Sequence, residues 1–287
     1  MPNTFLNSQW RLRPLLICHI GAVLLLASWL WQPTRQLWDR FDLALFTLLN
    51  EPVHATGLWA HIWAIGSMRP VDLAVGVLML AVILKADLVF SGAQVRRALF
   101  AFLAVLLAML LFRVGFAELV KLMGWQRPSA SLVVEGSARL TELFPTWEER
   151  WDMKDSASRS FPGDHASVLL IWALFMSFFA RGWKLLLVWS MAVLFMLPRL
   201  VAGAHWASDA LVGGVFLSLL GLAWGCYTPF ASKASAWLER ISAPLTRQLA
   251  RLPLLGRVSV ISGRGEAPRS EGCPARRPQV IWPDATK

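Results

Sequence analysis

The chain has 287 residues, of which 56% are hydrophobic and 16% are charged, whereas a soluble domain carries about 25% charged residues. This composition excludes a soluble cytosolic enzyme. The net charge of +10 does not indicate nucleic-acid binding, because Lys and Arg fall mainly in short segments between apolar runs and after residue 227. Sixteen Trp residues suit an integral membrane protein, in which indole rings lie at the lipid–water interface.

Apolar runs close to the length that crosses a bilayer, roughly 20 residues, recur along the chain. They predict an all-α integral membrane fold, a bundle of six transmembrane helices within residues 14–227. The expected spans are Pro14–Trp31, Pro70–Leu84, Ala98–Leu119, His165–Ala180, Trp183–Val201 and Ser208–Tyr227.

Between the first two spans, Gln36–Asn50 combines apolar residues at helical spacing with charges at Asp39, Arg40 and Asp42. This pattern predicts an amphipathic helix that lies on the membrane surface. Such a helix could line a lateral entry for lipid, and simple packing of the helix against the bundle is the alternative.

Basic residues mark one side of the membrane. They lie next to the expected spans or between them, with few acidic residues, at Arg11, Arg13, Lys85, Arg96, Arg97, Arg181 and Lys184. The positive-inside rule then places both termini in the cytoplasm. We expect residues 1–13 to be a cytoplasmic N-terminus, 14–227 the catalytic membrane domain and 228–287 a basic cytoplasmic tail. The Gly/Pro/Arg-rich end of this tail, Ser262–Lys287, is expected to be disordered.

Two histidines lie at the outer ends of the expected spans. His205 precedes Asp209 by one helical turn, so a carboxylate can hold a proton on one imidazole nitrogen and leave the other free as a nucleophile. The fourth span opens with Pro162-Gly163-Asp164-His165, where a helix N-terminus can bind an anion through backbone N–H groups.

Three cations belong to the same ends: Lys121, Arg127 and Arg199. A guanidinium matches two phosphate oxygens at once, so the set predicts a phosphoryl-transfer site. The alternative is a metal site, with ligands Asp164, His165, His205 and Asp209. Three cations converging there would repel a divalent ion, so we expect no metal and no cofactor.

The combination Arg199-x5-His205-x3-Asp209, the Pro162–His165 turn and Lys121 before Arg127-Pro128 resembles the type 2 phosphatidic acid phosphatase superfamily, over about Ala98–Tyr227. The resemblance implies a phosphohistidine intermediate. His205 would be the nucleophile, Asp209 its orienting carboxylate and His165 the general acid. Arg127, Arg199, Lys121 and the Gly163 turn would bind phosphate.

Three positions depart from the family pattern, one of them Pro198, which stands where Ser commonly precedes the arginine. Only five residues separate Lys121 from Arg127, where the family has six. Asp164 lies in a Pro-Gly-Asp-His sequence where the family usually has Pro-Ser-Gly-His. We expect Asp164 either to keep His165 protonated or to cap the helix that begins there.

The segment Lys154–His165 is most similar to a branch of the superfamily that modifies lipid A. This resemblance implies undecaprenyl diphosphate as donor and lipid A as acceptor, at the periplasmic face of a bacterial inner membrane. A phosphatase that uses water as acceptor is the alternative, because no residue separates the two acceptors. A transporter fits less well, because the charges cluster at one membrane face rather than near the midplane.

Overall fold

The computed structural model describes residues 9–249 and 251, and its regular elements are helices, as predicted. All six expected spans form helices with similar bounds. These are α1 (Leu12–Leu30), α4 (Arg69–Leu84), α5 (Val95–Leu122), α9 (Asp164–Ser177), α10 (Trp183–Val201) and α11 (Val215–Cys226), the last continuous with the π-helical turn η2 (Asp209–Gly214).

Within the described residues, four helices are long and apolar enough to cross a membrane: α1, α5, α10 and the continuous segment formed by η2 and α11. The helices α4 and α9 have 16 and 14 residues, shorter than the roughly 20 that usually span a bilayer. The chain is therefore a helical membrane protein.

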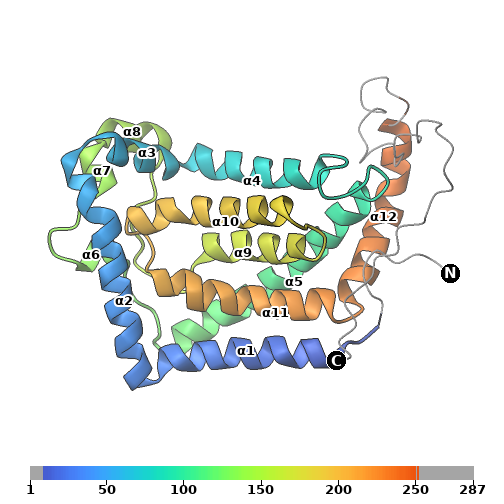
Figure 1. The fold of residues 1–287 in the computed structure, drawn as a ribbon, viewed down its shortest axis with the longest axis horizontal. Coiled ribbons are helices and arrows are strands. Elements are labelled where there is room, and N and C mark those ends of the chain that lie inside the picture. The colour runs from blue at the N-terminus through green and yellow to red at the C-terminus, as the bar shows by residue number, and fades with distance from the viewer. Residues whose placement is uncertain (1–8, 250, 252–287) are drawn as a thin grey trace.

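The long helices run alongside one another, and two helices cross the ends of this bundle (Figure 1). The helix α2 (Gln32–Asn50) crosses one end and α12 (Phe230–Leu249) crosses the other. The end crossed by α2 also carries short elements that the sequence did not predict. These are η1 (Glu51–Ala55), α3 (Leu58–Gly66), α6 (Ala130–Val133), α7 (Leu140–Leu143) and α8 (Pro145–Trp151).

Small residues let α11 approach α5 closely. A Cβ atom on Gly221 would lie 2.5 Å from Cβ of Met109, and one on Gly225 would lie 2.8 Å from a methyl group of Val105. Close backbone approach through small residues is typical of helix packing in membranes. This contact packs α11 directly against α5.

The predicted amphipathic helix exists as α2, but the prediction for its charged face was partly wrong. Asp42 is 1% exposed and turns inward with Asn50, whereas Leu37 and Leu48 are 61% and 69% exposed. Asp42 is buried because Arg127 and Ser208 offer it polar partners inside the protein.

The helix α12 covers the first part of the predicted tail. It is amphipathic, with Trp237, Ile241 and Leu245 exposed at helical spacing. The expected disorder of Ser262–Lys287 lies outside the described residues.

Candidate active site

A narrow pocket lies between the start of α9 and the end of α10. It is lined by residues from the start of α9, from the end of α10 and from the segment that leads into η2. These residues are Gly163, His165, Ala166, Met196, Arg199, Leu200, His205 and Ala210. Both predicted catalytic histidines and one predicted phosphate-binding arginine therefore face the same pocket.

The geometry of His205 leaves one ring nitrogen free. Its Nδ1 atom lies 2.8 Å from the carbonyl oxygen of Ser160 and 3.5 Å from Oδ2 of Asp209. A carbonyl oxygen only accepts hydrogen bonds, so Nδ1 carries the proton. The lone pair is then on Nε2, which is the form that a nucleophilic histidine needs.

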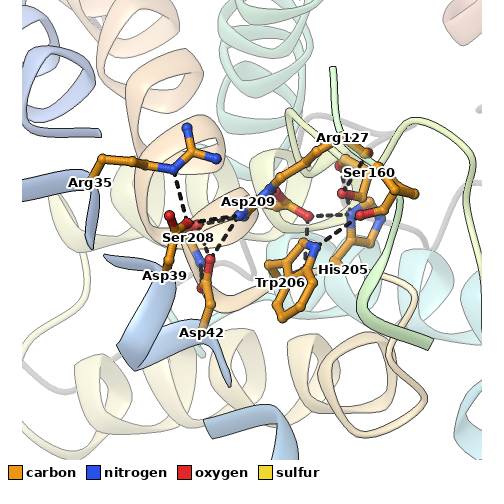
Figure 2. A network of polar contacts seen from close by, with 10 residues as sticks. Arg35, Asp39, Asp42, Arg127, Ser160, His205, Trp206, Ser208 and Asp209 are labelled. Atoms are coloured by element: carbon orange, nitrogen blue, oxygen red, sulfur yellow. Dashed lines mark hydrogen bonds and ion pairs between the residues drawn. The ribbon is translucent and has the colours of Figure 1, made fainter. Parts of the chain in front are cut away.

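Asp209 is fully buried and its two oxygens accept hydrogen bonds from different groups (Figure 2). Oδ1 accepts from Nη2 and Nε of Arg127, at 2.8 and 3.2 Å. Oδ2 accepts from the backbone N–H of Trp206 at 2.8 Å. These bonds fix the carboxylate beside His205.

Arg127 contacts Asp209 but is not among the residues that line the pocket of the two histidines. It lines a different pocket instead. Its guanidinium also donates to Oδ2 of Asp42 at 3.0 Å and to the hydroxyl of Ser208 at 2.5 Å. Asp42 in turn accepts from the backbone N–H and the hydroxyl of Ser208, at 2.7 and 2.6 Å (Figure 2). In this arrangement Arg127 holds the carboxylate next to His205 and lies outside the pocket that the two histidines line.

The carboxylate of Asp42, on α2, is almost fully buried, which is unusual for an acidic side chain. Burial raises the pKa of Asp42, and the Arg127 charge and the hydrogen bonds from Arg127 and Ser208 act in the opposite direction. A buried carboxylate needs such partners to remain charged. The spacing of charges on α2 did not predict that Asp42 would be buried as an acceptor for Arg127 and Ser208.

His165 lines the pocket, and its two ring nitrogens have different neighbours. Its Nε2 atom lies 2.9 Å from the carbonyl oxygen of Phe195, so Nε2 carries a proton and Nδ1 is the atom that can gain or lose one. The Oδ1 atom of Asp72 lies 3.8 Å from this Nδ1. Asp72 therefore sits next to the exchangeable proton of the predicted general acid.

Arg199 is 5% exposed and is held by three protein oxygens. Its Nη1 donates to the carbonyl oxygens of Ser67 and Lys154, at 3.1 and 3.0 Å, and its Nη2 donates to Oδ2 of Asp72. Asp72 was missed by the sequence analysis. Its signal was present, because it is the one charged residue in the expected span Pro70–Leu84, and charges within spans are rare and functional.

Gly163 lines the pocket, but its N–H donates to the carbonyl oxygen of Asp209 at 3.1 Å. The free N–H groups at this helix start belong to the next residues, since the first turn of a helix has no intrahelical acceptors. The positive end of α9 thus points at the pocket through His165 and Ala166.

We expect Gly163→Ala to destabilise the protein by about 1–3 kcal/mol, because the new Cβ would lie 2.9 Å from the Asp209 carbonyl oxygen and the backbone must shift. The measurement is the thermal unfolding midpoint of the purified protein in detergent. Gly115→Ala is the matched control, since no atom lies within 4 Å of its new Cβ. Equal midpoints for the two variants would contradict the close contact.

Two predicted residues lie away from the pocket. Nζ of Lys121 lies 3.9 Å from Glu118 and its side chain is 60% exposed. The Asp164 carboxylate pairs with Arg113, and among the described residues it accepts no hydrogen bond from a backbone N–H group. Both line a separate polar pocket on the other side of the Phe161–Asp164 segment. The two expectations for Asp164 are replaced by this ion pair, and Asp72 occupies the place beside His165.

Among residues 9–249 and 251, no three His, Cys, Asp or Glu side chains come together in a way that could hold a metal ion. The positive groups at the pocket are instead the guanidinium of Arg199 and the N-terminus of α9.

Comparison with known proteins finds a family model and a relative that are similar to the segment around this site. Residues 97–233 match the model of the PAP2 superfamily. The chain is also 28% identical over 232 residues to lipid A 1-diphosphate synthase of Escherichia coli (strain K12), and the alignment covers 79% of this chain and 92% of that protein. No solved structure matches the chain. The matched segment contains both pocket histidines and Arg199, whereas Asp42 and Asp72 lie before it.

Proposed function

We propose that the chain is an enzyme of the PAP2 superfamily that acts on lipid phosphates, since residues 97–233 match the model of that family. It transfers a phosphoryl group from undecaprenyl diphosphate to a phosphate of lipid A, through a phosphohistidine. The observation that carries the proposal is the convergence of His165, Arg199 and His205 on one pocket at the start of α9. The name of the relative supports lipid A as the acceptor.

In the first half of the reaction, Nε2 of His205 attacks the terminal phosphorus of the donor. The bond from phosphorus to the bridging oxygen breaks, and this oxygen leaves with a proton from Nδ1 of His165. Arg199 and the N-terminus of α9 bind the remaining phosphate oxygens, where negative charge is concentrated during transfer. Asp209 and the Ser160 carbonyl oxygen stabilise the proton on Nδ1 of His205.

In the second half, a phosphate oxygen of the acceptor attacks the phosphohistidine. The P–N bond breaks, His205 is regenerated, and His165 accepts any proton that the acceptor loses. Water in place of the acceptor lipid would release inorganic phosphate by the same steps, which is the phosphatase alternative.

We further propose that α4 and α9 cross the membrane with the four longer helices, giving six spans with both termini in the cytoplasm. The pocket end, which α2 crosses, then faces the periplasm of a bacterial inner membrane. The basic residues near the other end support this orientation. Residues 14–227 would form the catalytic unit, flanked by residues 1–13 and the tail 228–287.

The test is to reconstitute the purified protein in lipid vesicles with undecaprenyl diphosphate and lipid A, and to analyse the lipids by mass spectrometry. Lipid A that has gained one phosphate supports the transferase. Release of inorganic phosphate without modified lipid A would establish the phosphatase instead. Absence of turnover of any lipid phosphate would contradict both.

We expect the activity to persist in saturating EDTA and to need no added Mg²⁺, because the phosphate charge is met by Arg199 and by the helix N-terminus. The measurement is the rate of donor consumption before and after chelation. Loss of the rate in EDTA, with recovery on addition of one metal, would contradict this charge assignment.

A further inference from the structure

Asp72 lies next to two pocket residues, Arg199 and His165. It lies in the first turn of α4, and its two oxygens face different partners: Oδ2 accepts a hydrogen bond from Arg199, and Oδ1 lies 3.8 Å from Nδ1 of His165. The Asp72 side chain is 28% exposed, whereas that of Arg199 is 6% exposed. The contact is therefore in the site and not on the outer surface.

The contact fixes how Arg199 meets a phosphate. Nη1 is held by two backbone carbonyl oxygens and Nη2 by Asp72, whereas Nε has no protein acceptor among the described residues. Arg199 lines the pocket, so its remaining N–H can donate to a phosphate oxygen there. The negative charge of Asp72 also offsets the charge of Arg199 and weakens its attraction for an anion.

The same carboxylate acts on His165. When Nδ1 carries the proton, it presents an N–H to Asp72, and when Nδ1 has lost the proton, it presents a lone pair to the negative oxygen. Asp72 therefore favours the proton-carrying form of His165. The other charged or titratable side chains that act on His165 are those of Arg199 and His205.

We propose that Asp72 is a positioning residue, which aims Arg199 at the phosphate and keeps His165 ready to donate its proton, at the cost of weaker anion binding in the resting site. This inference rests on the proposed phosphoryl transfer. It also implies that the active site is completed by a residue outside the segment that matches the family.

The test is Asp72→Asn, which preserves the shape of the side chain and can still accept a hydrogen bond from Arg199. We expect kcat with the donor lipid to fall by about tenfold or more, because His165 loses the negative charge that favours its proton-carrying form, and general acid–base catalysis contributes about 10²- to 10⁴-fold. We expect inorganic phosphate to bind about tenfold more tightly, because a negative charge next to Arg199 is gone. A purely structural role would not move the two readouts in opposite directions.

Phosphate binding is measured by isothermal titration calorimetry of the full chain in detergent, which does not depend on turnover. Glu142→Gln is the matched control, because it removes an exposed carboxylate of α7 that pairs with Arg139 and has no contact with Arg199 or His165 among the described residues. It should change neither readout. Unchanged or weaker phosphate binding in Asp72→Asn would overturn the role of Asp72, and so would an unchanged kcat. An inactive wild-type protein that binds phosphate would instead count against the proposed function alone.

Discussion

His205→Ala is expected to lower turnover of the donor lipid by about 10⁴-fold or more while the protein remains folded in the membrane. The variant removes the ring nitrogen that carries the lone pair of a residue lining the pocket, and residue 205 lies between α10 and η2 rather than within a long helix. The assay follows donor consumption by the purified variant. A rate above a few per cent of wild type would contradict the nucleophile assignment.

Labelling separates the two histidines. A donor with a radioactive terminal phosphate, in the absence of acceptor, should label the wild-type protein with the acid-labile, alkali-stable chemistry of a phosphohistidine. The label should be absent from His205→Ala and should form slowly in His165→Ala, which retains the nucleophile. His54→Ala is the control, since His54 is exposed in η1 at the same end of the molecule.

Local spacing predicted those parts of the molecule whose residues lie close together in the sequence. The apolar runs gave the bounds of the long helices within a few residues, because helix length and burial in lipid follow from local composition. The spacing of His205 and Asp209 placed their side chains on one side of a helical turn, and Nδ1 lies 3.5 Å from Oδ2.

Contacts between distant segments were not accessible in the same way. Asp72 and Arg199 are 127 residues apart, and Asp42 and Arg127 are 85 residues apart, so no spacing rule relates them. The burial of Asp42 depends on how α2 crosses the bundle end, which no property of α2 alone determines (Figure 1).

Neighbours in sequence were also misleading in one place. Asp164 precedes His165, which suggested that its carboxylate could act on the imidazole. Consecutive residues on a helix point in different directions, and Asp164 turns to Arg113 on α5. Lys121, in the last turn of α5, also lies away from the pocket, near Glu118. Its position agrees with the one-residue difference between its spacing to Arg127 and the spacing in the family.

Asp209→Asn is the second variant with a large expected effect. In a comparable histidine–carboxylate pair, the same change costs about 10⁴-fold because the imidazole adopts the wrong tautomer. In this protein the Ser160 carbonyl oxygen also holds the proton on Nδ1, at 2.8 Å. We therefore expect a smaller loss in kcat, about 10²- to 10³-fold, from the missing charge that stabilises His205 during transfer.

The structure also predicts a loss of stability for Asp209→Asn. The carboxylate accepts hydrogen bonds from Arg127 and from the backbone N–H of Trp206, and an amide offers an acceptor to only one of them. The cost should be about 1.5–3 kcal/mol, as for other hydrogen bonds to charged groups. Glu239→Gln, in α12 at the opposite end of the bundle, is the control for both kcat and the unfolding midpoint. If Asp209→Asn kept the wild-type kcat, the Ser160 carbonyl oxygen alone would suffice to orient His205, and Asp209 would serve only to hold Arg127.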